Sequence, residues 1–203
     1  MQEAFISKRF SSGNDPGPMK IILMRHGKPA LENYRAVAAR DMVDWIADYD
    51  RSDIGTDAAT PEAIAAARDI GLAATSTAPR ALTSLAALGK AQAIEDTTFR
   101  EAALPVVSVP LLSLSPFTWV FVFRLLWLCG VAKDSESYAQ AKQRSRQAAD
   151  KLAALAGGPD SILLLGHGFM NRLIARQLLR QGWLEVSKTG SGYWGFAVYE
   201  KAE

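Results

Sequence analysis

Short runs of consecutive apolar residues alternate along the chain with longer segments in which apolar positions recur every three or four residues. The runs are typical of buried strands, and the spaced positions are typical of amphipathic helices. We predict strands at residues 20–24, 72–77, 161–165 and 193–199, with weaker candidates at 94–98 and 106–109. We predict helices at 42–48, 61–69, 79–93, 137–156 and 169–181.

The alternation of strands and helices predicts an α/β fold, with three α/β/α layers and a mixed, mostly parallel sheet. Ligands of such sheets bind beyond the carboxyl ends of the strands. Residues 1–18 have no apolar secretory core and end in a Gly/Pro-rich run. We interpret them as a disordered extension, with Met19 as a second candidate for the first residue. We expect one catalytic domain over residues 19–203.

Composition and charge narrow the function classes. The chain has 23 Lys+Arg and 21 Asp+Glu, which argues against a nucleic-acid protein, since such a protein needs a concentrated basic surface. Apolar residues make up 49% of the 203, which rules out global disorder. The single cysteine, Cys129, allows no internal disulfide and no cysteine-based zinc site. The apolar segment 115–130 is shorter than the ~20 residues of a membrane span and contains Arg124. We therefore expect a cytoplasmic protein without a membrane association.

Both histidines lie one or two residues beyond an apolar run and have glycine beside them, in Arg25-His26-Gly27 and Gly166-His167-Gly168. A neutral imidazole can attack phosphorus, and an arginine supplies donors that match phosphate oxygens. Gly27 allows a close backbone approach, and His167 could hold a phosphoryl oxygen. The alternatives are two ordinary loop histidines or a metal site. Because no third ligand stands at a metal-binding spacing, we predict no metal.

Three motifs together resemble the histidine phosphatase superfamily, which includes the cofactor-dependent phosphoglycerate mutases. They are LMRHG at 23–27, STAPRA at 76–81 and LLLGHG at 163–168, and the resemblance runs from Met19 to the C-terminus. It implies that His26 becomes phosphorylated and that Arg25, Arg80 and His167 complete the phosphate pocket. It also implies metal-independent phosphomonoester hydrolysis without a cofactor. Independently, Arg80 lies at a predicted helix start, where the helix dipole favours phosphate.

A leaving alkoxide needs a proton from a positioned acid. Glu101 is our candidate, because it follows a predicted strand and resembles the acidic residue of the family at that point. Asp96 and Glu95 are the alternatives, and an ordinary surface glutamate is the plainer interpretation. Lys28 departs from the Glu, Gln or Thr that family members carry after RHG; it either adds a phosphate contact or points into solvent.

The expected substrate is a phosphorylated small molecule or a phosphoprotein. Mutase-type phosphoryl transfer, a phosphohistidine protein phosphatase and a non-catalytic phosphate-binding or interaction module are the alternative functions. In a helix over 115–130, Trp119, Phe123 and Trp127 would share one stripe. Core packing is the plainer interpretation of this stripe. The alternative is an apolar cap that selects aromatic or lipid-like phosphate esters.

Overall fold

A six-stranded sheet forms the centre of the molecule. The computed structural model describes residues 18–31, 35–91, 93–157 and 161–202; all but one residue of the predicted extension at 1–18 lie outside these ranges. The strand order is β4–β3–β6–β1–β8–β7. The strands are β1 (Met19–Arg25), β3 (Leu72–Thr75), β4 (Ile94–Glu95), β6 (Ile162–Gly166), β7 (Leu184–Lys188) and β8 (Phe196–Lys201). Only β8 runs against its two neighbours, so the sheet is mixed and mostly parallel, as predicted.

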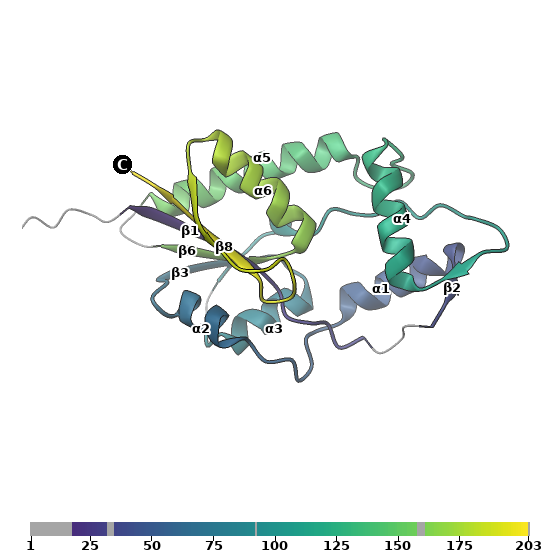
Figure 1. Ribbon diagram of the computed structural model, residues 1–203, viewed down its shortest axis with the longest axis horizontal. Coiled ribbons are helices and arrows are strands. Elements are labelled where there is room, and N and C mark those ends of the chain that lie inside the picture. The colour runs from purple at the N-terminus through teal and green to yellow at the C-terminus, as the bar shows by residue number, and fades with distance from the viewer. Residues whose placement is uncertain (1–17, 32–34, 92, 158–160, 203) are drawn as a thin grey trace, which may run out of the picture.

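Helices cover both faces of this sheet (Figure 1). The helices α5 (Tyr138–Ala156) and α6 (Gly168–Arg180) lie on one face, and α2 (Pro61–Arg68) and α3 (Pro79–Ala87) lie on the other. Successive residues of a strand point to opposite faces. The buried residues Ile21 and Leu23 therefore pack against α5 and α6, whereas their neighbours Ile22 and Met24 pack against α2 and α3. These contacts give the three layers that the sequence predicts.

Two helices begin at residues whose side chains are typical of helix N-caps. The Thr60 hydroxyl accepts a hydrogen bond from the backbone N–H of Ala63, and Pro61 occupies the first position of α2. Ser137 and Gln140 form a reciprocal capping box at the start of α5. The Gly157-Gly158-Pro159 run of the sequence predicts the end of α5, and its last two residues lie outside the described ranges.

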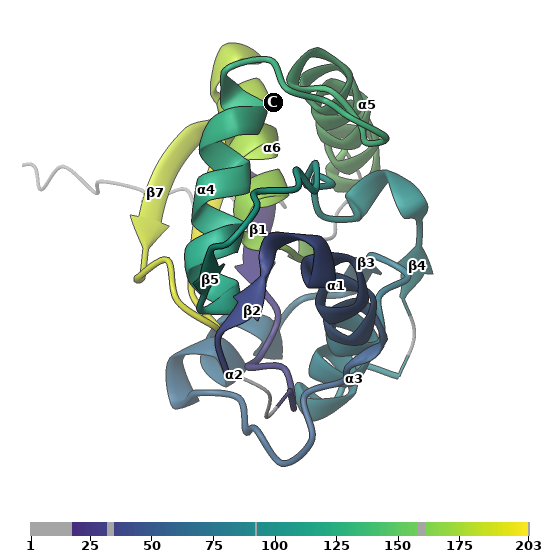
Figure 2. The same ribbon diagram turned by 90° about the vertical axis from the view of Figure 1, so that its right-hand side faces the viewer.

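A separate group of elements, which we call the cap, lies beyond the carboxyl ends of the strands (Figures 1 and 2). It contains β2 (Val37–Ala38), the 3₁₀ helix η1 (Ala39–Asp41), α1 (Met42–Arg51), β5 (Ser113–Leu114) and α4 (Pro116–Leu128). Its apolar cluster is distinct from the clusters on the two faces of the sheet and includes the buried Trp45, Trp119 and Phe123. Trp127 continues the same helix stripe into the main core. The stripe is therefore core packing.

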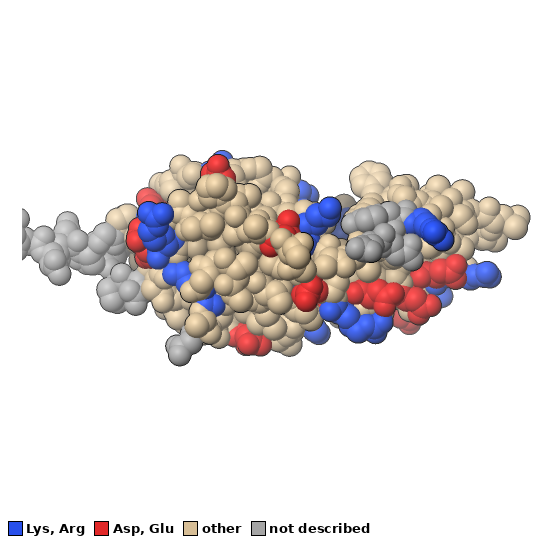
Figure 3. All heavy atoms as spheres, turned by 90° about the horizontal axis from the view of Figure 1, so that it is seen from below, with Lys and Arg blue, Asp and Glu red and all other residues tan. Residues whose placement is uncertain are grey.

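Charges of both signs lie interspersed on the face formed by α1, α2 and α3 (Figure 3). That face carries no concentrated basic patch. Among the helices in the described ranges, none combines the length and apolar character needed to cross a membrane.

Some predicted boundaries were wrong for identifiable reasons. The helix predicted at 79–93 ends at Ala87, because the chain turns at Gly89 with a φ of 72°. The strand predicted at 94–98 is only two residues long, since the Asp96 side chain caps the 3₁₀ helix η2 (Thr97–Phe99).

Two further differences involve whole strands. Residues 106–109 form no strand, because their valines pack individually against the cap cluster. Strand β7 was missed, because all five of its residues are exposed and its sequence lacks the apolar pattern of a buried strand.

We expect Phe123→Ala to lower the free energy of unfolding by about 3–5 kcal/mol, because the ring is fully buried. Phe121→Ala is the matched control: the same substitution two residues away, at a ring that is 64% exposed, should change stability by less than about 0.5 kcal/mol. Urea unfolding measures both. An equal loss in the two variants would show that the exposed side of α4 is covered in solution.

Candidate functional site

The carboxyl ends of three adjacent strands bring the predicted site residues together. Strand β1 ends at Arg25, and β6 ends at Gly166, its partner in the parallel ladder. The next residues, His26 and His167, therefore lie side by side, with ring centroids 5.1 Å apart and the ring planes at 62°. Strand β3 lies on the other side of β6 and leads into α3, which carries Arg80 in its first turn.

The His26 ring has a defined orientation. Its backbone N–H donates to the carbonyl of Gly166 over 3.0 Å, and its Nδ1 lies 2.7 Å from the carbonyl of Gly27. Because a carbonyl only accepts, Nδ1 carries the proton and Nε2 keeps its lone pair. Burial, followed by the charges of His167 and Arg80, holds the pKa of His26 well below its ordinary value. The ring is therefore neutral and nucleophilic at neutral pH.

Gly27 is required by close packing. A Cβ at this position would lie 2.6 Å from a ring carbon of Trp194. The Asp57 carboxylate accepts 2.7 Å hydrogen bonds from the Trp194 indole and from the backbone N–H of Lys28. Asp57, a residue that sequence reasoning missed, thus fixes the loop that carries His26. The side chain of Lys28 is exposed, and the structure does not bring it into the cavity described below.

His167 is held by a hydroxyl and a guanidinium. Its Nε2 lies 2.7 Å from Oγ of Ser76, and its Nδ1 lies 3.5 Å from Nη2 of Arg80. Since arginine only donates, Nδ1 accepts, and Nε2–H donates to Ser76. Burial, followed by the charges of Arg80 and Arg25, keeps the pKa of His167 well below its ordinary value. Sequence reasoning assigned Ser76 no role, although its place at the end of the strand beside β6 could have indicated one.

The two arginines beside the histidines use some, but not all, of their hydrogen-bond donors within the described part of the protein. Arg80, whose side chain is 3% exposed, donates to the carbonyl of Tyr49 and to a carboxylate oxygen of Asp50, both over 3.1 Å. Arg25 donates to the carbonyl of Ser191 over 3.2 Å. The Nε atoms of both arginines are buried without a partner among the described residues. Donors of this kind can bind an anion without first losing a protein partner.

Two tyrosines cover these arginines. The Arg25 guanidinium lies 4.3 Å from the ring centre of Tyr193, and the Arg80 guanidinium lies 4.7 Å from that of Tyr49. Burial, followed by the charge interaction with Tyr193, raises the pKa of Tyr49 above its ordinary value, although the charges of Arg80 and Arg25 oppose this. Tyr193 also lies 5.7 Å from the His26 ring. Both phenols are therefore part of the site, and neither was predicted.

A cavity of about 510 Å³ opens between the sheet edge and the cap. Arg25, Arg80, His167 and Tyr193 form the part of its lining that adjoins His26. His26 itself is 2% exposed and is in ring contact with two lining residues, His167 and Tyr193. Other basic residues of the lining are Arg100, Arg124 and Arg144, and its acidic residues are Asp50 and Glu101. The excess of arginine makes the cavity suited to an anionic ligand.

The side chain of Glu101 lines this cavity, and its carboxylate lies at the N-terminus of α6. Its Oε1 accepts from the backbone N–H groups of Ala102 and Met170 over 3.0 and 2.8 Å. Among the described residues, its Oε2 accepts only from the backbone N–H of Phe169, over 3.0 Å, and so keeps further acceptor capacity. The alternatives Asp96 and Glu95 do not line the cavity.

Asp96 has a different set of partners. Burial acts to raise the pKa of Asp96, but hydrogen bonds from Lys151 and Thr98 outweigh it and lower the value to about 2. The carboxylate therefore connects the end of the sheet to α5.

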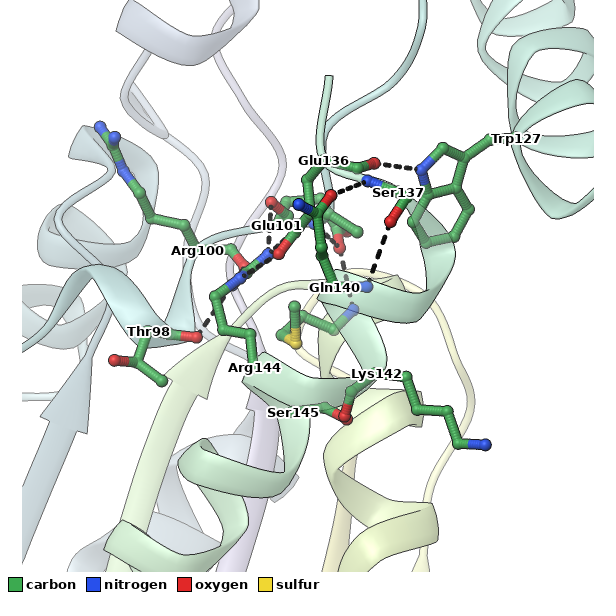
Figure 4. A network of polar contacts seen from close by, with 12 residues as sticks. Thr98, Arg100, Glu101, Trp127, Glu136, Ser137, Gln140, Lys142, Arg144 and Ser145 are labelled. Carbon is green, nitrogen blue, oxygen red and sulfur yellow. Dashed lines mark hydrogen bonds and ion pairs between the residues drawn. The ribbon is translucent and has the colours of Figure 1, made fainter. Parts of the chain in front are cut away.

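Arg144 organises the segment that carries Glu101 (Figure 4). Its guanidinium donates to both carboxylate oxygens of Glu136, over 2.7 and 2.6 Å. It also donates to the carbonyls of Thr98, Arg100 and Glu101, over 2.9, 2.7 and 3.4 Å. One side chain of α5 therefore fixes three backbone carbonyls within the four residues that end at the candidate acid.

From the cap side, Arg124 donates to the carbonyl of Ala102 over 2.9 Å. Its guanidinium stacks on Trp127 and Phe169, at 4.8 and 4.5 Å from the ring centres. The Glu101 segment is thus held from both sides. Within the described ranges, no group of three or more His, Cys, Asp or Glu residues could hold a metal ion.

Comparisons with known proteins give one family match. The family model of the histidine phosphatase superfamily (branch 1) matches residues 21–195. No curated protein matches the chain.

Three solved structures share the fold. A mycobacterial glucosyl-3-phosphoglycerate phosphatase is 22% identical, covers 80% of each chain and has a TM-score of 0.51. Mycobacterial hydrolase 2 is 20% identical, covers 89% of this chain and 81% of its own, and has a TM-score of 0.55. A phosphoserine phosphatase of Entamoeba histolytica is 16% identical, covers 88% of this chain and 89% of its own, and has a TM-score of 0.50. At these identities the likeness establishes the fold.

The lowered histidine pKa values predict how stability depends on pH. Below the unfolded value of about 6.5, the unfolded chain binds protons that the folded chain excludes. The free energy of unfolding should therefore fall as the pH decreases from about 6.5, by up to ~1.4 kcal/mol per pH unit for each histidine. Urea unfolding at pH 7.5, 6.5 and 5.5 measures the slope, and His26→Gln or His167→Gln should each reduce it.

Asp96→Asn is the control for this measurement. The carboxylate of Asp96 titrates near pH 2 in the folded chain, below the range of the experiment, so the variant should keep the wild-type slope. A wild-type stability that is flat between pH 7.5 and 5.5 would contradict the assignment of two buried neutral imidazoles.

Proposed function

The chain belongs to the histidine phosphatase superfamily, and we propose that it is a metal-independent phosphomonoester hydrolase acting through a phosphorylated His26. The observation that carries this proposal is the pairing of two buried, neutral imidazoles with two arginines whose Nε atoms have no described partner. A tetrahedral phosphoryl group needs this combination of one nucleophile and several convergent donors. Arg25 and Arg80 would donate to its oxygens, and His167 would join them by turning its Nε2–H from Ser76 to a phosphoryl oxygen.

The proposed reaction has two steps. In the first, Nε2 of His26 attacks phosphorus, the bond to the ester oxygen breaks, and the leaving alkoxide takes a proton from Glu101. In the second, the Glu101 carboxylate removes a proton from water, the hydroxide attacks phosphorus, and the P–N bond breaks to release inorganic phosphate. Oε2 of Glu101 is the atom proposed to carry the proton, because it accepts only one backbone hydrogen bond.

A small phosphorylated molecule suits the cavity better than a folded phosphoprotein does. Its volume of about 510 Å³ lies within the range of small-molecule sites. The cap elements α1 and α4 supply part of its lining, so that the site is partly roofed. The similar structures named as phosphatases of glucosyl-3-phosphoglycerate and phosphoserine support the same substrate class.

The first test is hydrolysis of 4-nitrophenyl phosphate at pH 5–8 in the presence of a chelator. We expect turnover by the wild type and a loss of at least about 10³-fold in His26→Ala, because the covalent route is removed. Arg146→Ala, at an exposed position on α5, controls for a general effect of substitution by alanine. Wild-type phosphate binding without turnover would favour a non-catalytic module, and transfer primed by a bisphosphate would favour a mutase.

The second test concerns Glu101. Protonation by an acid matters more for a poor leaving group than for 4-nitrophenolate, which leaves as a stable anion. Glu101→Gln should therefore lower kcat/KM about 10²–10⁴-fold on an alkyl phosphate and far less on 4-nitrophenyl phosphate. Equal losses on the two substrates would assign Glu101 to anchoring α6 instead of to proton transfer.

A further inference from the structure

The side of the cavity that faces away from the sheet is apolar. The cap supplies Trp45 and Ile46 from α1 and Phe117 and Val120 from α4, and Leu104 completes this side. The proposed chemistry uses none of these side chains. The cavity therefore combines a cationic floor, suited to a phosphoryl group, with an apolar wall on the side of the cap.

Three of the cap rings form a continuous row that begins at the phosphate-binding residues. The Arg80 guanidinium lies over Tyr49, 4.7 Å from its ring centre. Tyr49 stacks on Trp45 with centroids 5.3 Å apart and ring planes at 20°. Trp45 meets the edge of Phe117 at 5.6 Å and 80°. All three rings line the cavity, and we call Tyr49, Trp45 and Phe117 the aromatic wall.

Core packing alone does not explain the whole wall. The buried stripe of α4 consists of Trp119, Phe123 and Trp127, which face the interior. Phe117 belongs to another face of the helix and is 46% exposed, although it lines the cavity. A half-exposed aromatic ring at the rim of a cavity gains free energy when a ligand covers it.

We propose that the leaving group of the substrate is a large apolar alcohol, with an aromatic ring that lies along the aromatic wall. This proposal rests on the proposed function for the position of the phosphoryl group. With the phosphoryl oxygens on Arg25, Arg80 and His167, the ester oxygen points into a cavity of about 510 Å³. A small polar alcohol would leave the wall in contact with water, whereas a fused ring would cover it and stack on it.

Binding of non-hydrolysable phosphonates tests the proposal independently of catalysis. Isothermal titration calorimetry would compare methylphosphonate, phenylphosphonate and 2-naphthylphosphonate. We expect each enlargement of the apolar group to tighten binding by about tenfold, from the area it removes from water. Phe117→Ala should weaken naphthylphosphonate about fivefold more than methylphosphonate. Phe121→Ala is the matched control, since this exposed phenylalanine one turn further along α4 does not line the cavity.

Hydrolysis of phenyl and 2-naphthyl phosphate, run in parallel, separates the two proposals. Equal affinity for the three phosphonates, together with phosphatase activity, would overturn the aromatic-wall proposal and leave the hydrolase intact. The expected order of affinities without hydrolysis of either ester would support the wall and overturn the hydrolase. Equal responses of Phe117→Ala and Phe121→Ala would also overturn the role of the wall, because a general effect on α4 would then explain both.

Discussion

The parallel hydrogen-bond ladder between β1 and β6 determines how the site is built. Neighbouring strands lie about 4.8 Å apart, and the ladder pairs Arg25 with Gly166. A histidine that follows each of these residues must therefore lie close to the other, and their rings are 5.1 Å apart. A register shift of one residue would move one of the histidines to the other face of the sheet. The buried runs of the two strands set this register and so set the chemistry at their ends.

This arrangement buries groups that can carry a charge, and burying a charge costs free energy. The surroundings offset that cost in a different way for each group. The histidines avoid it by remaining neutral. Arg80 cannot lose its proton, and it is compensated by the Asp50 carboxylate, a backbone carbonyl and the face of Tyr49. Asp50 is largely exposed, so its carboxylate can give up this ion pair to water when an anion binds. The site thus has a replaceable counter-ion at its rim.

The features that follow from local patterns were predictable. These include the runs of β1 and β6, the caps of α2 and α5, and the convergence of His26, His167 and Arg80. Features that depend on distant contacts were not. Ser76 meets His167 across 91 residues, and Asp57 meets Trp194 across 137. The role of β7 likewise comes from pairing with β8, since none of its residues is buried. Sequence periodicity indicates which side of a helix or strand is buried, but not which distant residue that side contacts.

The burial of His26 has a consequence for the timing of the reaction. A phosphorylated imidazole exposed to bulk water would hydrolyse whenever any water molecule reached it from the correct side. His26, packed against the rings of His167 and Tyr193, is 2% exposed. The lifetime of the proposed intermediate would then depend on the admission of one water molecule through the cavity, after the first product has left. Rapid quenching would in that case capture the phosphorylated chain as an isolable species.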